Sequence, residues 1–259
     1  MGTAAAVASL SAAGLAGIIW GTYTGLLQDD AALCMSRVTR NVKGSRYEWK
    51  DATSMYLDRR SFARCVQSLC QQLEGHGVDI VAGIDAAGYV LGAAIASRLN
   101  VGFLTIRKGG SLCVATDEVE YSYSKGKGKR MELREGAFAA GTRVAIVDQW
   151  VDSGGSMKAA ISLVERQQGV VAACVALCIE DGPSVAKQNN AAWLRSRWPC
   201  VTLVQPGTQL QRECNSHWLS SWGKRPPSPD STITVLDRRT GNIVGFKDKL
   251  PGKTTTGYI

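Results

Sequence analysis

One short segment of the chain combines residue types that suit phosphate binding. Within Val144–Met157 an apolar run ends at Asp148 and is followed closely by Ser153-Gly-Gly-Ser156. Where such a loop leads into a helix, free backbone N–H groups, two hydroxyls and the helix dipole converge on one point, which suits a phosphate monoester. The segment is not a Walker loop, because no Lys-Ser/Thr pair follows the glycines. A plain strand-to-helix turn is the alternative interpretation.

The hydrophobic pattern predicts the elements that must hold this segment. Apolar residues recur at helical spacing between Tyr56 and Gly75, where Asp58 is the expected N-cap. Beyond this helix, the pattern predicts strands at 78–85, 101–108, 143–148 and 170–179, and helices at 88–99 and 155–167. Strands that alternate with helices of this length imply right-handed crossovers. We therefore expect an α/β fold with a mostly parallel central sheet flanked by helices.

A polar, Gly-rich insertion separates two of the expected strands. It covers residues 109–142 and contains Tyr121 and the basic run Lys125-Gly-Lys-Gly-Lys-Arg130. The insertion is too long for a connecting loop that has neither secondary structure nor a function of its own in a compact domain. It is therefore either a mobile lid or a hairpin excursion.

The two ends of the chain are expected to be extensions. Residues 3–28 carry no charge and are rich in Ala, Gly and Leu. We favour a packed amphiphilic helix there, since glycines and hydroxyl residues dilute the segment and no basic flank precedes it. A targeting or membrane segment is the alternative. Residues 212–259 hold eight basic and four acidic residues, and 233–246 is a candidate hairpin. This tail is either solvated, which we favour, or binds a partner.

Charge and cysteine usage indicate the setting. The net charge of +8 and the isoelectric point near 9.1 favour anionic partners, which include phosphorylated small molecules, nucleic acid and membrane surfaces. The eight cysteines form no CxxC pair, and with two histidines no zinc-ligand spacing arises. Several cysteines occupy apolar positions of the predicted elements, as buried thiols do. A cytoplasmic, reducing setting is therefore favoured over a disulfide framework.

The segment from Val144 resembles the phosphoribosyl pyrophosphate (PRPP) signature of type I phosphoribosyltransferases. In that family a Val/Ile-rich strand ends in two acidic residues that hold the ribose hydroxyls, and a Thr/Ser-Gly-Gly-Thr/Ser loop holds the phosphate. The resemblance implies PRPP-binding roles for Asp148, Gln149, Ser153, Gly154, Gly155 and Ser156.

The resemblance extends in unbroken order over 45–181 and is closest to adenine phosphoribosyltransferases. Tyr47–Thr53 looks like their purine-covering hood, Val81–Ala93 like their pyrophosphate loop, Val101–Gly110 like the strand and basic loop that follow, and Val119–Ser122 like the start of their flexible catalytic loop. The implied organisation is an N-terminal extension over 1–44, a phosphoribosyltransferase domain with a small hood over 45–211, and a basic extension over 212–259. A homodimer is implied in the same way.

The resemblance also implies which residues meet the pyrophosphate and the base. The implied pyrophosphate-binding residues are Asp85, Ala86, Ala87, Gly88, Arg107, Lys108, Lys125 and Lys127. The implied base-binding residues are Trp49, Lys50 and Asp152, and the implied catalytic residues are Asp148, Asp152 and Glu120. Displacement of pyrophosphate builds charge on both sides of the breaking bond. Mg²⁺ carried by PRPP is therefore the implied cofactor, with Asp148 as its candidate protein ligand.

Four positions depart from the adenine enzymes. Ala87 stands where they usually place an Arg, Ser122 stands where they carry a Gly, and Gln149 replaces the second ribose acid, whose charge an amide cannot supply. Asp152 instead matches the hypoxanthine, guanine and xanthine enzymes, in which an Asp lies beside purine N7 as a proton acceptor or donor. A loop Asp that caps the following helix is the alternative interpretation of Asp152.

Two functions follow from these observations. We favour an active purine phosphoribosyltransferase that joins a purine base to PRPP with Mg²⁺, giving a nucleoside monophosphate and pyrophosphate. The alternative is a catalytically impaired protein that binds PRPP or a nucleotide in a regulatory role. Nucleic acid is not the expected partner, and membrane contact depends on the segment over 3–28.

Overall fold

The structure is a computed structural model that describes residues 30–35, 37–38, 51–123, 126–181, 190–215, 233–236 and 243–247. Three predicted site residues, Trp49, Lys50 and Lys125, lie outside these ranges, as does the apolar segment over 3–28. Within the described ranges, no helix has both the length and the apolar character that a membrane crossing requires.

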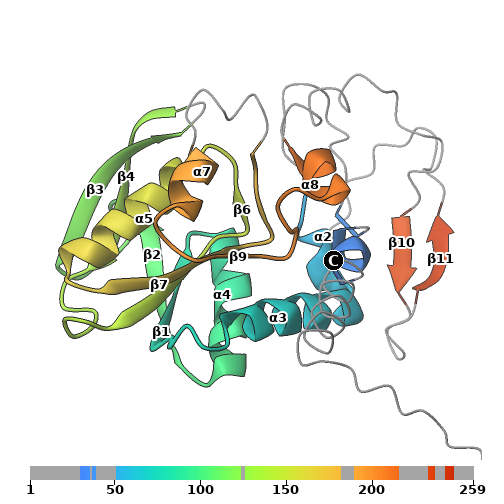
Figure 1. The fold of residues 1–259 in the computed structure, drawn as a ribbon, viewed down its shortest axis with the longest axis horizontal. Helices are drawn as coiled ribbons and strands as arrows, with labels where there is room; N and C mark the ends of the chain where they lie inside the picture. Colours follow the sequence, from blue (N-terminus) through green and yellow to red (C-terminus); the bar gives the residue numbers. More distant parts are fainter. Residues whose placement is uncertain are drawn as a thin grey trace, which may run out of the picture.

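A seven-stranded sheet, counted over the described residues, forms the centre of the fold (Figure 1). Five parallel strands follow one another in space as β2 (Gly102–Lys108), β1 (Ile80–Ile84), β5 (Arg143–Val147), β7 (Val170–Ala176) and β9 (Cys200–Thr202). Beyond β2 the sheet continues with the antiparallel strands β4 (Gly126–Arg134) and β3 (Thr116–Tyr123). The predicted mostly parallel α/β sheet is therefore confirmed. The carboxyl ends of its parallel strands meet along one edge, where ligands of such folds bind.

The long insertion after β2 is a β-hairpin. β3 and β4 pair from Thr116 opposite Arg134 to Tyr123 opposite Gly126, with an irregular register between Tyr121 and Tyr123. β4 also pairs with β2, which joins the hairpin to the main sheet. Of the two predicted forms, the hairpin excursion is confirmed.

Helices cover both faces of the sheet. α3 (Arg59–Leu73) and α4 (Ala87–Leu99) lie on one face, and α5 (Gly155–Arg166) and α7 (Asn190–Arg195) lie on the other (Figure 1). Val81 and Val147 pack with α3 and α4, whereas their strand neighbours Ala82 and Ile146 pack with α5. All four residues are fully buried, as expected for parallel strands covered on both sides.

The helix predicted between Tyr56 and Gly75 is divided into two helices, α2 (Ser54–Leu57) and α3. Asp58 separates them. Its carboxylate accepts the backbone N–H groups of Arg60 and Ser61 at 2.9 and 3.0 Å, which caps α3. The predicted N-cap is thus confirmed.

The strand predicted over 170–179 is also interrupted. Leu177 leaves the strand because its N–H donates to the carbonyl of Gln149 at 3.0 Å. The last two residues form β8 (Cys178–Ile179), which pairs in parallel with β6 (Trp150–Val151). This second, small sheet anchors the segment that follows Asp148.

Beyond Asp181 the sequence pattern did not reveal α7, β9 and α8 (Gln209–Cys214). These elements are only three to six residues long, too short to display a hydrophobic period. The hairpin predicted over 233–246 is confirmed as β10 (Ile233–Leu236) paired with β11 (Ile243–Lys247).

Candidate active site

The segment predicted to bind phosphate, Ser153-Gly-Gly-Ser156, forms what we call the glycine cradle. It lies between the end of β5 and the first turn of α5. Asp148 follows the strand directly, and the chain bends at 152–154 before the helix begins at Gly155. Gly154 has φ 74°, a left-handed conformation that glycine adopts most readily, and its carbonyl accepts the N–H of Lys158 at 2.9 Å. The first-turn N–H groups of α5 have no carbonyl partner within the helix, so they are able to bind an anion.

A cavity of about 270 Å³ opens at this cradle. Eight of the residues predicted for the site line it, namely Asp85, Lys108, Asp148, Asp152, Ser153, Gly154, Gly155 and Ser156. The remaining lining residues are Tyr121, Lys129, Trp150, Val151 and Met157. Residues from four separate segments meet here because β1, β2 and β5 all end at this edge of the sheet. The structure therefore brings most of the predicted PRPP-binding residues together at one cavity, and phosphate binding there stays a prediction.

Other predicted site residues do not line the cavity. These are Ala86, Ala87, Gly88, Arg107, Glu120 and Gln149. Glu120 is exposed on β3, and strand neighbours point to opposite faces, so Tyr121 rather than Glu120 faces the cavity. The sequence indicated Tyr121 and Lys129 only as members of the insertion. Trp150, Val151 and Met157 were not predicted. Their one signal is position, since Trp150 and Val151 follow Asp148 closely and Met157 lies in the first turn of α5.

Asp148 has an unusual carboxyl group. Burial raises its pKa from 3.8 to about 6, although the backbone N–H groups of Gln149 and Trp150 act in the opposite direction. The N–H of Gln149 donates to its Oδ1 at 2.7 Å, and its own N–H donates to the carbonyl of Val175 at 3.0 Å. The backbone on both sides thus holds a desolvated carboxylate that is suited to hydroxyl donors or a cation.

The predicted pyrophosphate loop lies between β1 and α4. Asp85 follows β1 and is joined to Ala86 by a cis peptide bond. Gly88 lies so close to the end of β5 that an added Cβ would stand 2.4 Å from the carbonyl oxygen of Val147 and 3.3 Å from Cα of Asp148. The start of α4 is therefore packed directly against the strand that delivers Asp148.

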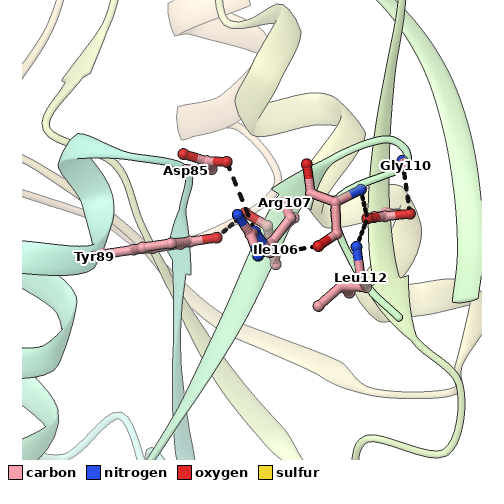
Figure 2. A network of polar contacts seen from close by, with 8 residues as sticks. Asp85, Tyr89, Ile106, Arg107, Gly110 and Leu112 are labelled. Carbon is pink, nitrogen blue, oxygen red and sulfur yellow. Dashed lines mark hydrogen bonds and ion pairs between the residues drawn. The ribbon is translucent and has the colours of Figure 1, made fainter. Parts of the chain in front are cut away.

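Arg107 pairs with Asp85 at the rim of the cavity (Figure 2). Its Nε lies 3.9 Å from Oδ2 of Asp85, and its Nη1 donates to the carbonyl of Ser111 at 3.1 Å. Beside it, the hydroxyl of Tyr89 donates to the carbonyl of Ile106 at 3.2 Å. Arg107 thus supports Asp85 and the loop after β2, while its neighbour Lys108 lines the cavity.

The loop after β2 is held by Glu132, which the sequence did not indicate. This side chain of β4 is only 1% exposed, and its carboxylate accepts the N–H groups of Gly110, Ser111 and Leu112 at 3.0, 2.6 and 2.6 Å (Figure 2). Burial alone would raise the pKa of Glu132, but these three N–H groups and the Thr116 hydroxyl lower it below its usual 4.5. One carboxylate therefore joins the hairpin to the loop that directly follows Lys108.

Replacing Glu132 by Gln is expected to destabilise the protein at pH 7 by roughly 1–2 kcal/mol, because an amide satisfies the three N–H groups less well. The folded-state pKa is depressed, so the stabilisation is present above the unfolded-state pKa and is lost as the pH falls through the folded-state pKa. Urea unfolding of both proteins should show their difference at pH 7 and its decline in acid. The exposed Glu135, changed to Gln, is the matched control and should stay within about 0.5 kcal/mol of the wild type. Equal midpoints for wild type and Glu132→Gln at pH 7 would contradict this role.

Gln149 turns away from the cavity toward α2. Its Nε2 donates to the hydroxyl of Tyr56 at 2.7 Å, and the Tyr56 ring lies 5.0 Å from that of Phe62. Burial, the main cause, raises the pKa of Tyr56 to about 12, which keeps the phenol neutral. The residue at the predicted position of the second ribose acid thus joins the strand end to the helix that follows the predicted hood.

The fold and the cavity define an α/β protein with a candidate anion-binding cavity at the carboxyl edge of its sheet. A family model described as phosphoribosyl transferase domain matches residues 52–203. The chain therefore belongs to the phosphoribosyl transferase domain family, as the resemblance predicted.

Individual relatives agree with this membership. The chain is 35% identical over 146 residues to the adenine phosphoribosyltransferase of Beijerinckia indica subsp. indica, which covers 56% of this chain and 81% of the relative. It is 37% identical over 124 residues to the adenine phosphoribosyltransferase of Sorangium cellulosum, covering 48% of this chain and 62% of that relative. The solved adenine phosphoribosyltransferase of Thermoanaerobacter pseudethanolicus superposes with a TM-score of 0.57 at 29% identity, over 64% of this chain and 93% of that one. The fold is thus that of the type I phosphoribosyltransferases.

Proposed function

We propose that the protein is a purine phosphoribosyltransferase of the adenine type, which transfers ribose 5-phosphate from PRPP to a purine base and releases pyrophosphate. The observation that carries this proposal is the cavity in which the glycine cradle, Asp148 and two lysines meet. The relatives named adenine phosphoribosyltransferases support a purine as the acceptor.

In this proposal the parts of the cavity bind different parts of PRPP. The cradle over 153–156 binds the 5-phosphate through backbone N–H groups and hydroxyls. Asp148 accepts hydrogen bonds from the ribose hydroxyls and stabilises the positive charge that grows on the ribose as the bond to pyrophosphate breaks. Lys108 and Lys129 also line the cavity and are the proposed groups that neutralise the leaving pyrophosphate. Lys125 and Lys127 are proposed to extend that role.

Asp152 is the proposed group for proton exchange with the base. It lines the cavity and is exposed, so a purine nitrogen is able to approach its carboxylate. Trp49 and Lys50 are the proposed hood residues that cover the base. Glu120 lies on the opposite face of β3 and would reach the base only after the hairpin rearranges.

The carboxylates of the cavity fit a Mg²⁺ ion that arrives with PRPP. Among the residues that the structure describes, no three His, Cys, Asp or Glu side chains gather into a metal site. Asp85 and Asp148 both line the cavity and are the candidate carboxylate ligands. Mg²⁺ commonly combines one or two such carboxylates with water and substrate phosphates. Bound in this way, the ion would supply charge neutralisation at the pyrophosphate.

The enzyme assay that tests the proposal uses the full chain with PRPP, Mg²⁺ and adenine, hypoxanthine or guanine. We expect pyrophosphate release that depends on the base, and fastest with adenine, together with the matching nucleoside monophosphate. PRPP-dependent thermal stabilisation without release of pyrophosphate for any base would overturn the enzyme and support a regulatory PRPP-binding protein. The regulatory function remains the second candidate because Gln149, at the position of the second ribose acid, hydrogen-bonds Tyr56 and does not line the cavity.

Restoring an acid at position 149 is expected to increase turnover. In Gln149→Asp the shorter side chain gives up the hydrogen bond to Tyr56 and adds a negative charge next to Asp148, which should raise kcat/KM for PRPP by roughly threefold to tenfold. Gln149→Asn is the matched control, because Asn has the shape of Asp without its charge. If the Asp and Asn variants perform alike, charge at this position does not limit the reaction.

A homodimer is proposed from the family resemblance. Val90 on α4 and Phe103 on β2 support it, since these apolar side chains are 47% and 37% exposed on neighbouring elements. Light scattering on the protein as it elutes from a size-exclusion column is expected to give twice the mass of one chain. The mass of a single chain at all concentrations would contradict the proposal. A cytoplasmic setting is proposed as well, and it accords with the eight cysteines, which are all free thiols.

A further inference from the structure

Two cysteines lie opposite each other at the far end of the sheet from the hairpin. Cys174 of β7 and Cys200 of β9 are register partners in a parallel strand pair. Both sulfurs belong to the face covered by α5 and α7, since Cys174 lies in that core and Cys200 packs against it. Neighbouring strands lie about 4.7–4.9 Å apart, and disulfides join Cα atoms separated by about 4.4–6.8 Å. The strand pairing therefore places these two residues at a separation that a disulfide can bridge.

The two thiols differ in access and in acidity. Cys174 is fully buried, whereas Cys200 is partly exposed on the edge strand. The side-chain hydrogen bond from Cys174 and the nearby Arg195 guanidinium lower the pKa of Cys200, against the effect of burial. The same hydrogen bond and burial raise the pKa of Cys174. An oxidant is thus able to reach the more acidic thiol, Cys200, and the protonated thiol of Cys174 lies beside it.

We propose that Cys200 and Cys174 form a reversible oxidation site, in which Cys200 reacts with a hydroperoxide and Cys174 resolves the product into a disulfide. The Cys200 thiolate attacks one peroxide oxygen, the O–O bond breaks, and Cys200 becomes a sulfenic acid while hydroxide leaves. The sulfur of Cys174 then attacks the sulfur of Cys200, the S–O bond breaks, and the Cys174 proton leaves with the hydroxyl as water. The two thiols lose two electrons in total, which reduce the peroxide, and an added dithiol reverses the change.

A second thiol pair provides an internal comparison. Cys178 of β8 and Cys214 of α8 also share a side-chain hydrogen bond, but these residues are 0% and 2% exposed, and the pKa of Cys178 is raised well above its usual value, chiefly by burial. Because both sulfurs of this second pair are buried, a peroxide has access to neither, and we expect the first oxidation step to be slow there. Cys113 is exposed and serves as the reference for unassisted oxidation.

Peptide mapping distinguishes these pairs. Trypsin leaves Cys174 and Cys178 on the peptide 167–187, Cys200 on 198–212 and Cys214 on 213–224. The folded full chain, carrying Cys113→Ser to suppress intermolecular disulfides, is treated with one equivalent of hydrogen peroxide, alkylated and digested without reductant. We expect 167–187 joined to 198–212 with the loss of two hydrogens, and its disappearance after dithiothreitol.

Single substitutions assign the sulfurs. Cys178→Ala should keep the joined peptide, Cys200→Ser should abolish it, and Cys174→Ser should leave a Cys200 sulfenic acid that dimedone traps. Thermal unfolding of each variant checks that it is folded. Joining of 167–187 to 213–224 instead, or oxidation of Cys113 in the native sequence with no joined peptide, would overturn the proposal. No substrate is present, so the outcome is independent of the phosphoribosyltransferase activity.

Discussion

Replacing Asp148 by Asn is expected to lower kcat/KM for PRPP by roughly 10²–10³-fold while the protein stays folded. The side chain keeps its shape and lies in the cavity beside the glycine cradle, but it loses the charge that opposes positive charge on the ribose. Loss of one group that stabilises transition-state charge has effects of this size. Initial rates of pyrophosphate release at varied PRPP concentration measure the change.

The control for this change is Asp181→Asn, which removes an exposed carboxylate outside the cavity. It should leave kcat/KM within about twofold of the wild type, since a remote surface charge is screened by solvent. A similar loss in both variants, or no loss in Asp148→Asn, would remove Asp148 from the mechanism.

The same substitution should stabilise the free protein at neutral pH. The folded-state pKa of Asp148 is raised from 3.8 to about 6, so ionisation of this carboxyl group destabilises the folded protein. The destabilisation is absent below pH 3.8 and complete above pH 6. Because the side chain is partly accessible, we expect a gain of roughly 1–2 kcal/mol for Asp148→Asn at pH 7 to 8, and none near pH 3.5. A variant that is less active and more stable indicates a group kept for function.

Replacing Gly88 by Ala is expected to destabilise the protein by roughly 2–3 kcal/mol or to prevent folding. The new Cβ would stand 2.4 Å from the carbonyl oxygen of Val147, and neither the strand end nor the helix start is able to move without displacing the other. Since Asp148 follows Val147, any molecules that fold should also bind PRPP weakly. Urea unfolding and PRPP-dependent thermal shifts measure the two effects.

Gly102→Ala is the matched control. A Cβ at Gly102, the first residue of β2, would meet only Cγ1 of Ile80 at 3.8 Å, an ordinary contact. Its stability should lie within about 0.5 kcal/mol of the wild type. If Gly88→Ala matches that control, the close approach of α4 to β5 does not limit stability.

The core of the fold could be predicted because its elements are long and periodic. A helix-length segment separates the strand ending at Ile84 from that ending at Lys108, and another separates the strand ending at Val147 from that ending at Ala176, so this alternation indicated a parallel sheet. Asp148 and the cradle could be predicted for the same reason, since the end of a parallel strand before a glycine-rich helix start is where ligands of such folds bind.

The rest of the site could not be predicted because it depends on contacts across the sheet. Glu132 reads as an ordinary acid of a polar insertion, and only the pairing of β4 with β2 places it beneath the loop at 110–112. Likewise, the facing of Tyr121 rather than Glu120 toward the cavity depends on the hairpin register. The partner of Gln149 lies 93 residues away in sequence, and no local pattern connects it to Tyr56.

The lining of the cavity has a consequence for how ions accompany the ligand. Among its described residues, three aspartates, at 85, 148 and 152, outnumber two lysines, at 108 and 129, so the formal charge of the lining is −1 when all five are ionised. A pyrophosphate ester adds several more negative charges to this small space. We therefore expect cations to be taken up along with the ligand, so that the affinity for PRPP rises with free Mg²⁺.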